Sequence, residues 1–315
     1  MRLPDRLLAS VGFFARDRPD FRYGGTGFVI STQGAHGNSF LHIITAGHVA
    51  EALESGSGAW IFGMNDKSGN KILLKSAGNA KWWYHPTQRA NVDCAVTLFA
   101  PGMLKEYDLS AIPEEMCVTE QEISNASLGV GDEINVVGLF TRYHGTSRHI
   151  PIVRSGNVAM MPTDPIPTDK YGPMEAYLVE GRSIGGLSGS PVFIRETLNL
   201  TGGTVDAKPK YMLGQGSLYL LGLMHGHWDV PVNFKTNEQA EAVNMGIAIV
   251  VPAKKILEVL NHPELVAMRK RINNQIGEDR TPTMDAALEA TESFTKEDFE
   301  AALCKVSQKV DSKTP

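Results

Sequence analysis

Three short segments carry the residue types that nucleophilic catalysis by a serine requires. They are ITAGHVAEAL with His48, NVDCAVTLF with Asp93 and SIGGLSGSPVFI with Ser188. A serine hydroxyl is a weak nucleophile at neutral pH and needs a base, and a neutral imidazole suits that task. A carboxylate holds the imidazole in the correct tautomer and stabilises its protonated form. The three residues are therefore expected to form a catalytic triad for amide hydrolysis.

The surroundings of Ser188 suggest an oxyanion site. In Gly186-Leu187-Ser188-Gly189 the glycines allow a tight turn that aims the backbone N–H groups of Gly186 and Ser188 into one hollow. Losing one such donor typically costs about 2.7–4 kcal/mol of transition-state stabilisation. The segment is not G-x-S-x-G, because position 190 is serine, and this disfavours an α/β-hydrolase elbow. A glycine-rich structural turn is the alternative.

His48 and Asp93 each have a simpler interpretation when taken alone. A single histidine after an apolar strand is most often a packed side chain, and a single aspartate at a strand start is most often a turn or cap residue. The catalytic interpretation depends on the three segments together.

The rest of the pattern predicts an all-β protein. From Leu7 to about Val251, apolar runs of about four to eight residues alternate with glycine-containing turns, which is typical of a β-sandwich or barrel. The run LLASVGFF is expected to be the first strand. Long helical patterns do not alternate with these runs, so a doubly wound α/β fold is not expected.

The pattern changes after Pro252. Apolar residues at helical spacing predict a helix packed on the barrel and interrupted near His262-Pro263. We expect a domain over residues 1–275, then a linker and short amphipathic helical tail over 276–315, with the last helix over Lys296–Val310. The tail docks on its own domain or binds a protein partner, and both alternatives stay open.

Composition limits the functional classes. The 315 residues carry a formal net charge of -5 at pH 7, with a pI of about 6.0, which argues against nucleic-acid binding. No stretch approaches the ~20 apolar residues of a membrane span, and no signal peptide is evident. Three irregularly spaced cysteines do not form a disulfide framework. A cytoplasmic location is expected.

Five blocks in register resemble the chymotrypsin/trypsin-like serine peptidases. They are GTGFVI, TAGHV, DCAV, GLSGSPVF and the pair YLLGLMHG with NMGIAIVVPAKKI. The sequences of these motifs are most similar to those of the bacterial HtrA-like and glutamyl-endopeptidase-like groups. The resemblance implies two antiparallel six-stranded β-barrels, roughly over 7–120 and 121–262, with the triad in the cleft between them. It also implies a serine endopeptidase that acts on polypeptides through an acyl-enzyme.

The resemblance also suggests a substrate pocket. Arg182 lies six residues before Ser188, and an arginine on the pocket floor would favour an acidic substrate side chain. The preferred interpretation of Arg182 is an exposed loop cation. Met224 is expected to face the pocket, together with Gly246 of the last strand. His225 either lines the pocket or hydrogen-bonds towards Asp93.

No metal or cofactor is expected. His225 and His227 lie two residues apart on one face of a strand, but no third ligand stands at a supporting spacing, and Cys94 and Cys117 lack a C-x-x-C partner. Two functional alternatives remain beside an active endopeptidase. One is a weak or inactive scaffold of the same fold, and the other is a regulated protease recruited through its C-terminal tail.

Overall fold

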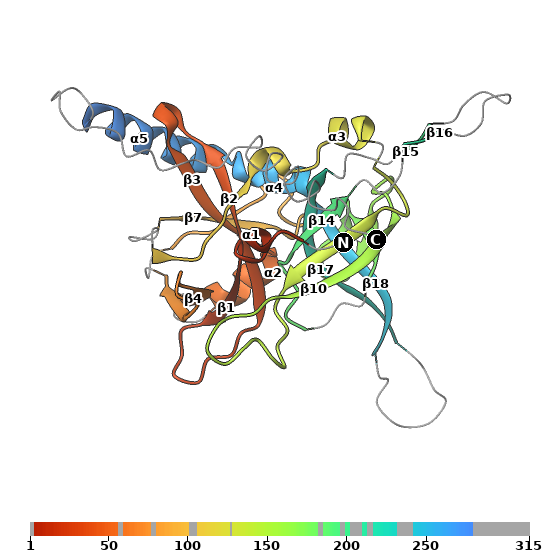
Figure 1. Cartoon of the computed structure of the whole chain (residues 1–315), viewed down its shortest axis with the longest axis horizontal. Coiled ribbons are helices and arrows are strands. Elements are labelled where there is room, and N and C mark those ends of the chain that lie inside the picture. The colour runs from red at the N-terminus through yellow and green to blue at the C-terminus, as the bar shows by residue number, and fades with distance from the viewer. Residues whose placement is uncertain are drawn as a thin grey trace, which may run out of the picture.

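The computed structural model shows two β-sheet assemblies in sequence, followed by two helices (Figure 1). The described residues are 3–55, 59–76, 80–100, 106–126, 128–181, 185–195, 199–201, 210–212, 217–231 and 242–279. The predictions for Arg182 and for a helix over Lys296–Val310 fall outside these ranges. Within them, no helix has both the length and the apolar content needed to cross a membrane.

The first half of the chain forms one sheet of eight strands. The order is β5-β4-β1-β2-β3-β7-β6, all antiparallel, and β8 pairs with β2 in parallel. The strands are β1 (Val11–Arg16), β2 (Gly25–Gln33), β3 (Ser39–Thr45), β4 (Trp60–Asn65), β5 (Lys71–Lys75), β6 (Trp83–Tyr84), β7 (Ala95–Phe99) and β8 (Ile112–Pro113). The sequence predicts six strands here. The structure adds β6 and β8, which have two residues each and therefore no detectable periodicity.

The second half contains the predicted closed barrel of six strands. Its order is β10-β13-β18-β17-β14-β9. The strands are β9 (Glu133–Gly138), β10 (Ile152–Met160), β13 (Tyr177–Glu180), β14 (Pro191–Arg195), β17 (Leu218–Pro231) and β18 (Ala242–Pro252). Two small antiparallel pairs extend from it, and they are β11 (Ile166–Thr168) with β12 (Gly172–Met174) and β15 (Asn199–Thr201) with β16 (Lys210–Met212). The all-β prediction is confirmed.

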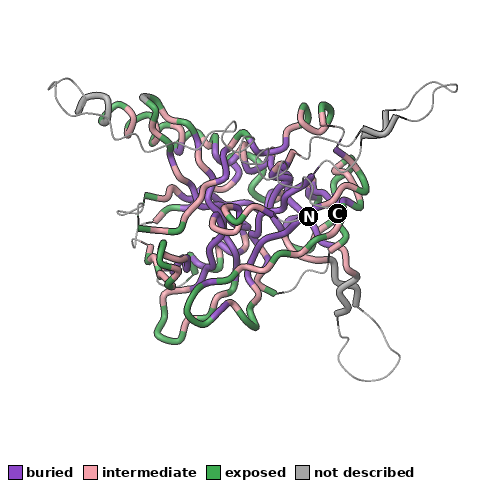
Figure 2. Tube along the Cα trace, in the orientation of Figure 1, coloured by how far each residue is buried: buried purple, intermediate pink, exposed green. Residues whose placement is uncertain are grey.

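Buried residues run through the centre of the molecule from one assembly into the other (Figure 2). Strand β14 shows how the two are joined. Val192 and Ile194 pack inside the barrel, whereas Phe193 between them packs in the larger cluster together with Phe14 and Ile43 of the first sheet. This alternation is the period of two that a strand imposes. The larger cluster therefore joins the two halves, while the barrel also has a smaller core of its own.

Short helices connect and cover the sheets. They are α1 (Asp5–Leu8), the 3-10 turn η1 (Ala35–Gly37), α2 (Gly47–Glu54), the 3-10 turn η3 (Glu114–Met116), α3 (Glu120–Asn125), α4 (Ala253–Leu260) and α5 (Pro263–Asp279). The run expected as the first strand is divided between α1 and β1, because a short apolar run alone cannot distinguish helix from strand. The predicted break at Pro263 is confirmed, since α4 ends at Leu260 and α5 begins at Pro263. Helix α5 runs past residue 275, where the sequence predicted the end of the domain.

Candidate active site

Two neighbouring strands bring His48 and Asp93 to the same edge of the first sheet. His48 is the second residue of α2, directly after β3, and Asp93 lies just before β7. Strands β3 and β7 are antiparallel and pair Thr45 with Ala95. The end of one strand therefore lies beside the start of the other. Gly47 permits the close approach, because a Cβ there would lie 3.0 Å from Asp93 Oδ1.

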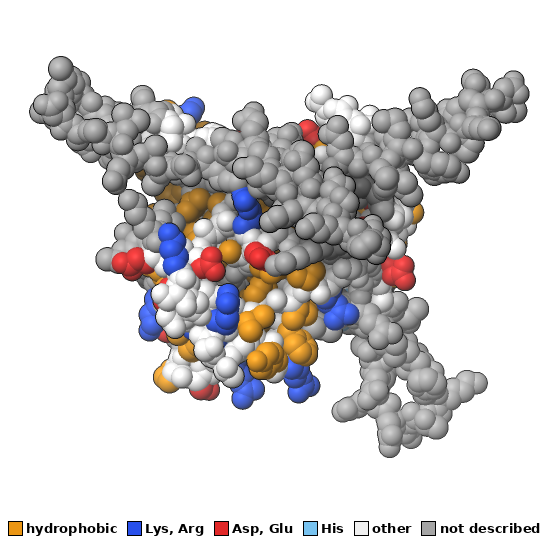
Figure 3. Space-filling model, in the orientation of Figure 1, with side chains coloured by type: hydrophobic (Ala, Val, Ile, Leu, Met, Phe, Trp, Pro, Cys, Tyr) orange, Lys and Arg blue, Asp and Glu red, His pale blue; other side chains and the backbone are white. Residues whose placement is uncertain are grey.

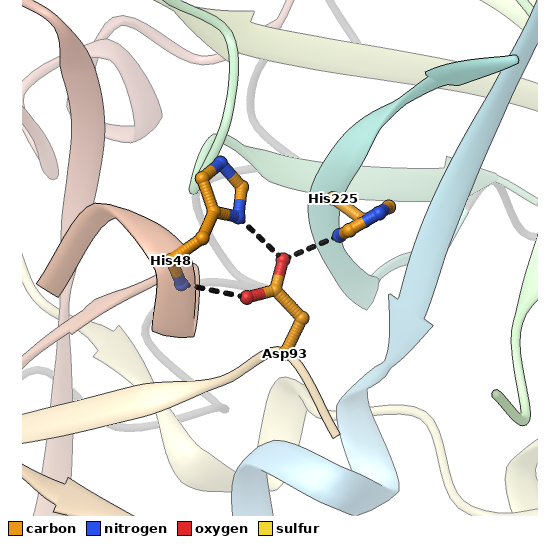
Figure 4. A group of neighbouring side chains, drawn as sticks. All are labelled: His48, Asp93 and His225. Carbon is orange, nitrogen blue, oxygen red and sulfur yellow. Dashed lines mark hydrogen bonds and ion pairs between the residues drawn. The ribbon is translucent and has the colours of Figure 1, made fainter. Parts of the chain in front are cut away.

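Asp93 holds His48 through two hydrogen bonds (Figure 4). His48 Nδ1 lies 2.8 Å from Asp93 Oδ2, and the His48 backbone N–H donates to Oδ1 at 2.8 Å. The two bonds fix both the carboxylate and the imidazole. The Asp93 side chain is 0% exposed while that of His48 is 29% exposed. The histidine can therefore meet a substrate while the carboxylate stays buried.

A second histidine reaches the same carboxylate from the other half of the chain. His225 Nδ1 lies 2.5 Å from Asp93 Oδ2. In the pairing of β17 with β18, Met224 faces Val250 and Gly226 faces Ile249, so His225 is the extra residue of a β-bulge. Bulges redirect a side chain out of the regular alternation. The structure thus places His225 at Asp93, which is one of the two arrangements considered from the sequence.

The hydrogen bonds determine the protonation of this cluster. Burial would raise the pKa of Asp93, but hydrogen bonds from His225 and His48 outweigh it and hold the pKa well below the usual value. Asp93 is therefore a carboxylate at neutral pH. When both rings donate Nδ1–H to it, a neutral His48 has Nε2 as its acceptor. That nitrogen is the one a general base needs.

Ser188 lies on the turn between β13 and β14, which is tied to the first sheet by Thr26. The Thr26 backbone N–H donates to the Ser188 carbonyl at 2.9 Å, and its hydroxyl donates to the Gly186 carbonyl at 2.7 Å. Gly186 and Gly189 have φ values of +100° and +82°, which favour glycine. The glycines flanking Ser188 are thus required by the turn.

The Ser188 hydroxyl donates to the main-chain carbonyl of His225, with an Oγ–O distance of 3.1 Å. The structure therefore brings Ser188 to the same cluster, through the residue whose ring contacts Asp93. Among the described residues, no hydrogen bond joins Ser188 to His48, which differs from the direct contact expected between nucleophile and base.

The backbone donors of this turn fall into two groups. The N–H of Gly189 donates to the Met224 carbonyl at 2.8 Å, and that of Ser190 donates to the Leu187 carbonyl at 2.9 Å. The N–H groups of Gly186 and Ser188 make no hydrogen bond to a described residue. These are the two amides that the sequence assigns to an oxyanion site.

The predicted substrate pocket is only partly visible in the described residues. Arg182 lies outside them. Met224, expected to face a pocket, is 2% exposed and packs inside the closed barrel, because its strand alternation points it inward. Gly246 on β18 has a φ of +78° and accepts a hydrogen bond from the Gly181 N–H at 2.8 Å.

Tyr171 is a site residue that the sequence did not reveal. It lies between β11 and β12, is 5% exposed, and its ring meets that of His225 edge to face at 5.8 Å between centroids. A Cβ added to Gly47 would lie 3.0 Å from Asp93 Oδ1 and 3.1 Å from the Tyr171 hydroxyl, so both oxygens flank Gly47. Burial and the Asp93 charge raise the pKa of Tyr171. Its segment, TDKYG, has only the signature of a turn.

His48, Asp93 and His225 are also residue types that bind metals, and their ligand atoms lie within 4.8 Å of one another. The two Nδ1–Oδ2 distances, 2.8 and 2.5 Å, have the length of direct hydrogen bonds. Ligands of a tetrahedral zinc with bonds of about 2.0–2.1 Å lie about 3.3 Å apart. The arrangement fits a hydrogen-bonded cluster and does not fit a metal between these atoms.

Three solved structures are similar to this chain at low identity. The MamO protease domain from Magnetospirillum magneticum is 13% identical, and the alignment covers 81% of this chain and 97% of that domain with a TM-score of 0.49. Deg5 is 15% identical, with 80% and 88% covered and a TM-score of 0.44. An inactive form of Rv3671c from M. tuberculosis is 15% identical, with 81% and 87% covered and a TM-score of 0.42. No protein family and no curated protein matches the sequence.

Proposed function

We propose that this protein is a serine endopeptidase in which Ser188 is the nucleophile, His48 the general base and Asp93 the residue that orients and stabilises His48. The observation that carries the proposal is the pair of hydrogen bonds through which the buried Asp93 carboxylate holds the backbone and the ring of His48. This pairing leaves Nε2 of a partly exposed imidazole as the acceptor. The turn that carries Ser188 lies near helix α2, since a Cβ added to Gly189 would lie 3.0 Å from the backbone nitrogen of Ala46.

The reaction begins when the Ser188 side chain rotates away from the His225 carbonyl and its hydroxyl meets His48 Nε2. Oγ attacks the scissile carbonyl while Nε2 takes the hydroxyl proton. Asp93 stabilises the imidazolium that forms. The N–H groups of Gly186 and Ser188 donate to the oxyanion of the tetrahedral intermediate.

Collapse of that intermediate breaks the C–N bond and forms an acyl-enzyme on Ser188. His48 gives its proton to the leaving amine, and a water deprotonated by His48 then hydrolyses the ester. No cofactor takes part in these steps.

The test is labelling with a fluorophosphonate probe, followed by peptide mapping. Wild-type protein is expected to be labelled on Ser188, Ser188→Ala is expected to remain unlabelled, and His48→Ala is expected to lose labelling because the serine loses its base. Melting temperatures confirm that the variants are folded. Labelling that persists in Ser188→Ala would refute the assignment.

The inactive scaffold is the second candidate, and one observation favours it. The Ser188 hydroxyl donates to the His225 carbonyl in place of His48. A folded wild-type chain that neither reacts with the probe nor cleaves any member of a peptide library would support the scaffold and end the endopeptidase proposal.

A further inference from the structure

A groove beside His48 runs along the first half of the molecule. One pocket, of about 520 Å³, is lined by His48 and Leu53 of α2, by Arg16 of β1 and by residues between Arg18 and Gly25. A second pocket, of about 620 Å³, is lined by Lys71, Leu73 and Arg142 among others. Phe21 and Arg22 line both pockets, so the two lie next to each other. We name these two adjacent pockets together the basic groove.

The lining of the basic groove is strongly cationic. Its cations are Arg16, Arg18, Arg22, Lys71 and Arg142, and the one acidic residue among its described lining residues is Asp20. The chain as a whole has a formal net charge of -5. A concave surface with one sign of charge concentrates ligands of the opposite sign. The groove is therefore positively charged on a chain that is negatively charged overall, and this favours an anionic ligand.

Polar contacts of these cations leave their charges unbalanced. Arg16 Nε donates to the Ala52 carbonyl at 2.7 Å, and Lys71 Nζ donates to the Gly145 carbonyl at 2.8 Å. Both acceptors are neutral. Within the described part of the chain, none of the five groove cations forms an ion pair with a carboxylate, whereas Lys75 nearby pairs with Asp17 at 3.0 Å.

The walls of the groove are held together before any ligand arrives. The segment between β1 and β2 lies beside the one between β9 and β10, as Figure 1 shows. Tyr23 of the first segment and His149 of the second share a hydrogen bond of 2.7 Å. Figure 3 shows Lys and Arg side chains around an apolar area on the lower part of this face. A preformed groove loses less entropy on binding than one that must be ordered.

The position of the groove indicates which part of a substrate it meets. His48 is one of its lining residues, and the described lining residues include none from β17 or β18. His48 donates the proton to the leaving amine. The chain that follows the cleaved bond therefore starts beside His48, which lines the groove.

We propose that the basic groove binds an acidic segment of the polypeptide substrate, on the carboxyl-terminal side of the bond that is cleaved. The inference rests on the proposed function and adds a substrate class to it. Carboxylate side chains meet the arginines, and apolar side chains pack on Phe21 and Leu73. Because His48, the proposed general base of peptide hydrolysis, lines the groove, a peptide is favoured over a nucleic acid as the polyanion.

The first experiment digests a proteome-derived peptide library with the full chain and reads the residues after each cut by mass spectrometry, with Ser188→Ala as the blank. Asp and Glu are expected to be enriched at about the first four positions after the cut. Cleavage without this enrichment would overturn the groove inference and leave the proposed function standing. No cleavage together with no fluorophosphonate labelling would overturn both.

The second experiment reverses charges in the groove. For a matched peptide pair that differs only in Glu or Gln after the cut, the preference for Glu is expected to fall by about tenfold in the double variant Arg22→Glu, Arg142→Glu. The same variant should gain a preference for Lys in those positions. Arg271→Glu, an exposed arginine on α5, is the matched control and should keep the wild-type preference.

A binding measurement separates the two classes of polyanion. Fluorescence anisotropy with folded Ser188→Ala protein should show tighter binding of the Glu peptide than of the Gln peptide, and the difference should shrink between about 0.05 M and about 0.5 M salt because ions screen exposed charges. Tighter binding of a single-stranded RNA oligonucleotide of equal charge would overturn the peptide assignment.

Discussion

The Ser188 hydroxyl donates a hydrogen bond to the main-chain carbonyl of His225 at 3.1 Å. The ring of the same His225 contacts Asp93 at 2.5 Å. One residue of the closed barrel thus holds Ser188 with its backbone and the Asp93 carboxylate with its side chain. Substitutions in and around this cluster should therefore change the reactivity of the serine.

His225→Leu is expected to lower the rate of fluorophosphonate labelling by about tenfold. Asp93 would lose one of the two histidines that stabilise its charge and orientation, and a hydrogen bond to a charged group contributes about 1.5–3 kcal/mol. His225→Asn is the matched variant, since its amide N–H can reach the position of Nδ1. Its rate should stay within about threefold of wild type. Equal rates in wild type and His225→Leu would show that the contact between His225 and Asp93 does not affect the reactivity of Ser188.

Asp93→Asn is expected to lower the labelling rate by about 10³- to 10⁴-fold, because an uncharged amide neither stabilises the His48 imidazolium nor fixes its tautomer. The serine and the base both remain, so the fold and any substrate binding should persist. A stopped-flow or time-course labelling experiment measures the change. A loss below about tenfold would contradict the assigned role of Asp93.

The same substitution predicts a pH effect on stability. The pKa of Asp93 in the folded chain lies below its unfolded value of 3.8, since the hydrogen bonds from both histidines outweigh burial. The Asp93 contribution to the free energy of unfolding is therefore fully present above about pH 3.8 and is lost as the pH falls through the folded pKa. The difference in unfolding free energy between wild type and Asp93→Asn should narrow below about pH 4. A difference that stays constant down to pH 2 would disagree with this.

His42 predicts a second acid-sensitive contribution. It is 0% exposed on β3, and burial, followed by the charge of Arg269, lowers the pKa of His42 to about 3. The unfolded chain binds a proton near pH 6.5 while the folded chain does not. The His42 contribution to the free energy of unfolding should therefore be complete above about pH 6.5. The free energy should then fall by up to about 1.4 kcal/mol per pH unit as the pH drops towards 3. Denaturant unfolding of His42→Gln should show a shallower dependence, and an unchanged slope would exclude His42 as the cause.

Gly47→Ala is expected to slow labelling by about tenfold, because the new methyl group would lie 3.0 Å from Asp93 Oδ1 and 3.1 Å from the Tyr171 hydroxyl. Gly129→Ala is the control, since a Cβ there meets nothing within 4 Å. Labelling rates and melting temperatures are measured for both. A Gly47→Ala rate equal to that of Gly129→Ala would mean that the crowding is relieved without cost.

The sequence predicted most of the strands and the pairing of His48 with Asp93, because each signal is local. Each side chain stands directly beside an apolar run, and antiparallel neighbours bring those ends together. The α1 turn was expected as strand because a short apolar run lacks enough residues to reveal its period. The two-residue strands β6 and β8 gave no periodicity at all.

The remaining parts of the site depend on tertiary structure. The bulge that extrudes His225 is defined by its pairing with β18, about 25 residues later in the chain, so regular alternation could not predict its direction. Tyr171 reaches the site because Asn91 Nδ2 donates to its carbonyl at 3.1 Å across the two halves. Neither contact leaves a pattern in the neighbouring residues.

The bulge at His225 also has a consequence for biosynthesis. Asp93 and His48 come from the first third of the chain, while the strand that shapes the bulge, β18, ends only at Pro252. A ribosome-bound chain that has not reached Pro252 contains His48, Asp93 and His225 but lacks the complete strand that shapes the bulge at His225. Under the proposed function, we expect Ser188 to become reactive only late in translation, after β18 has paired with β17.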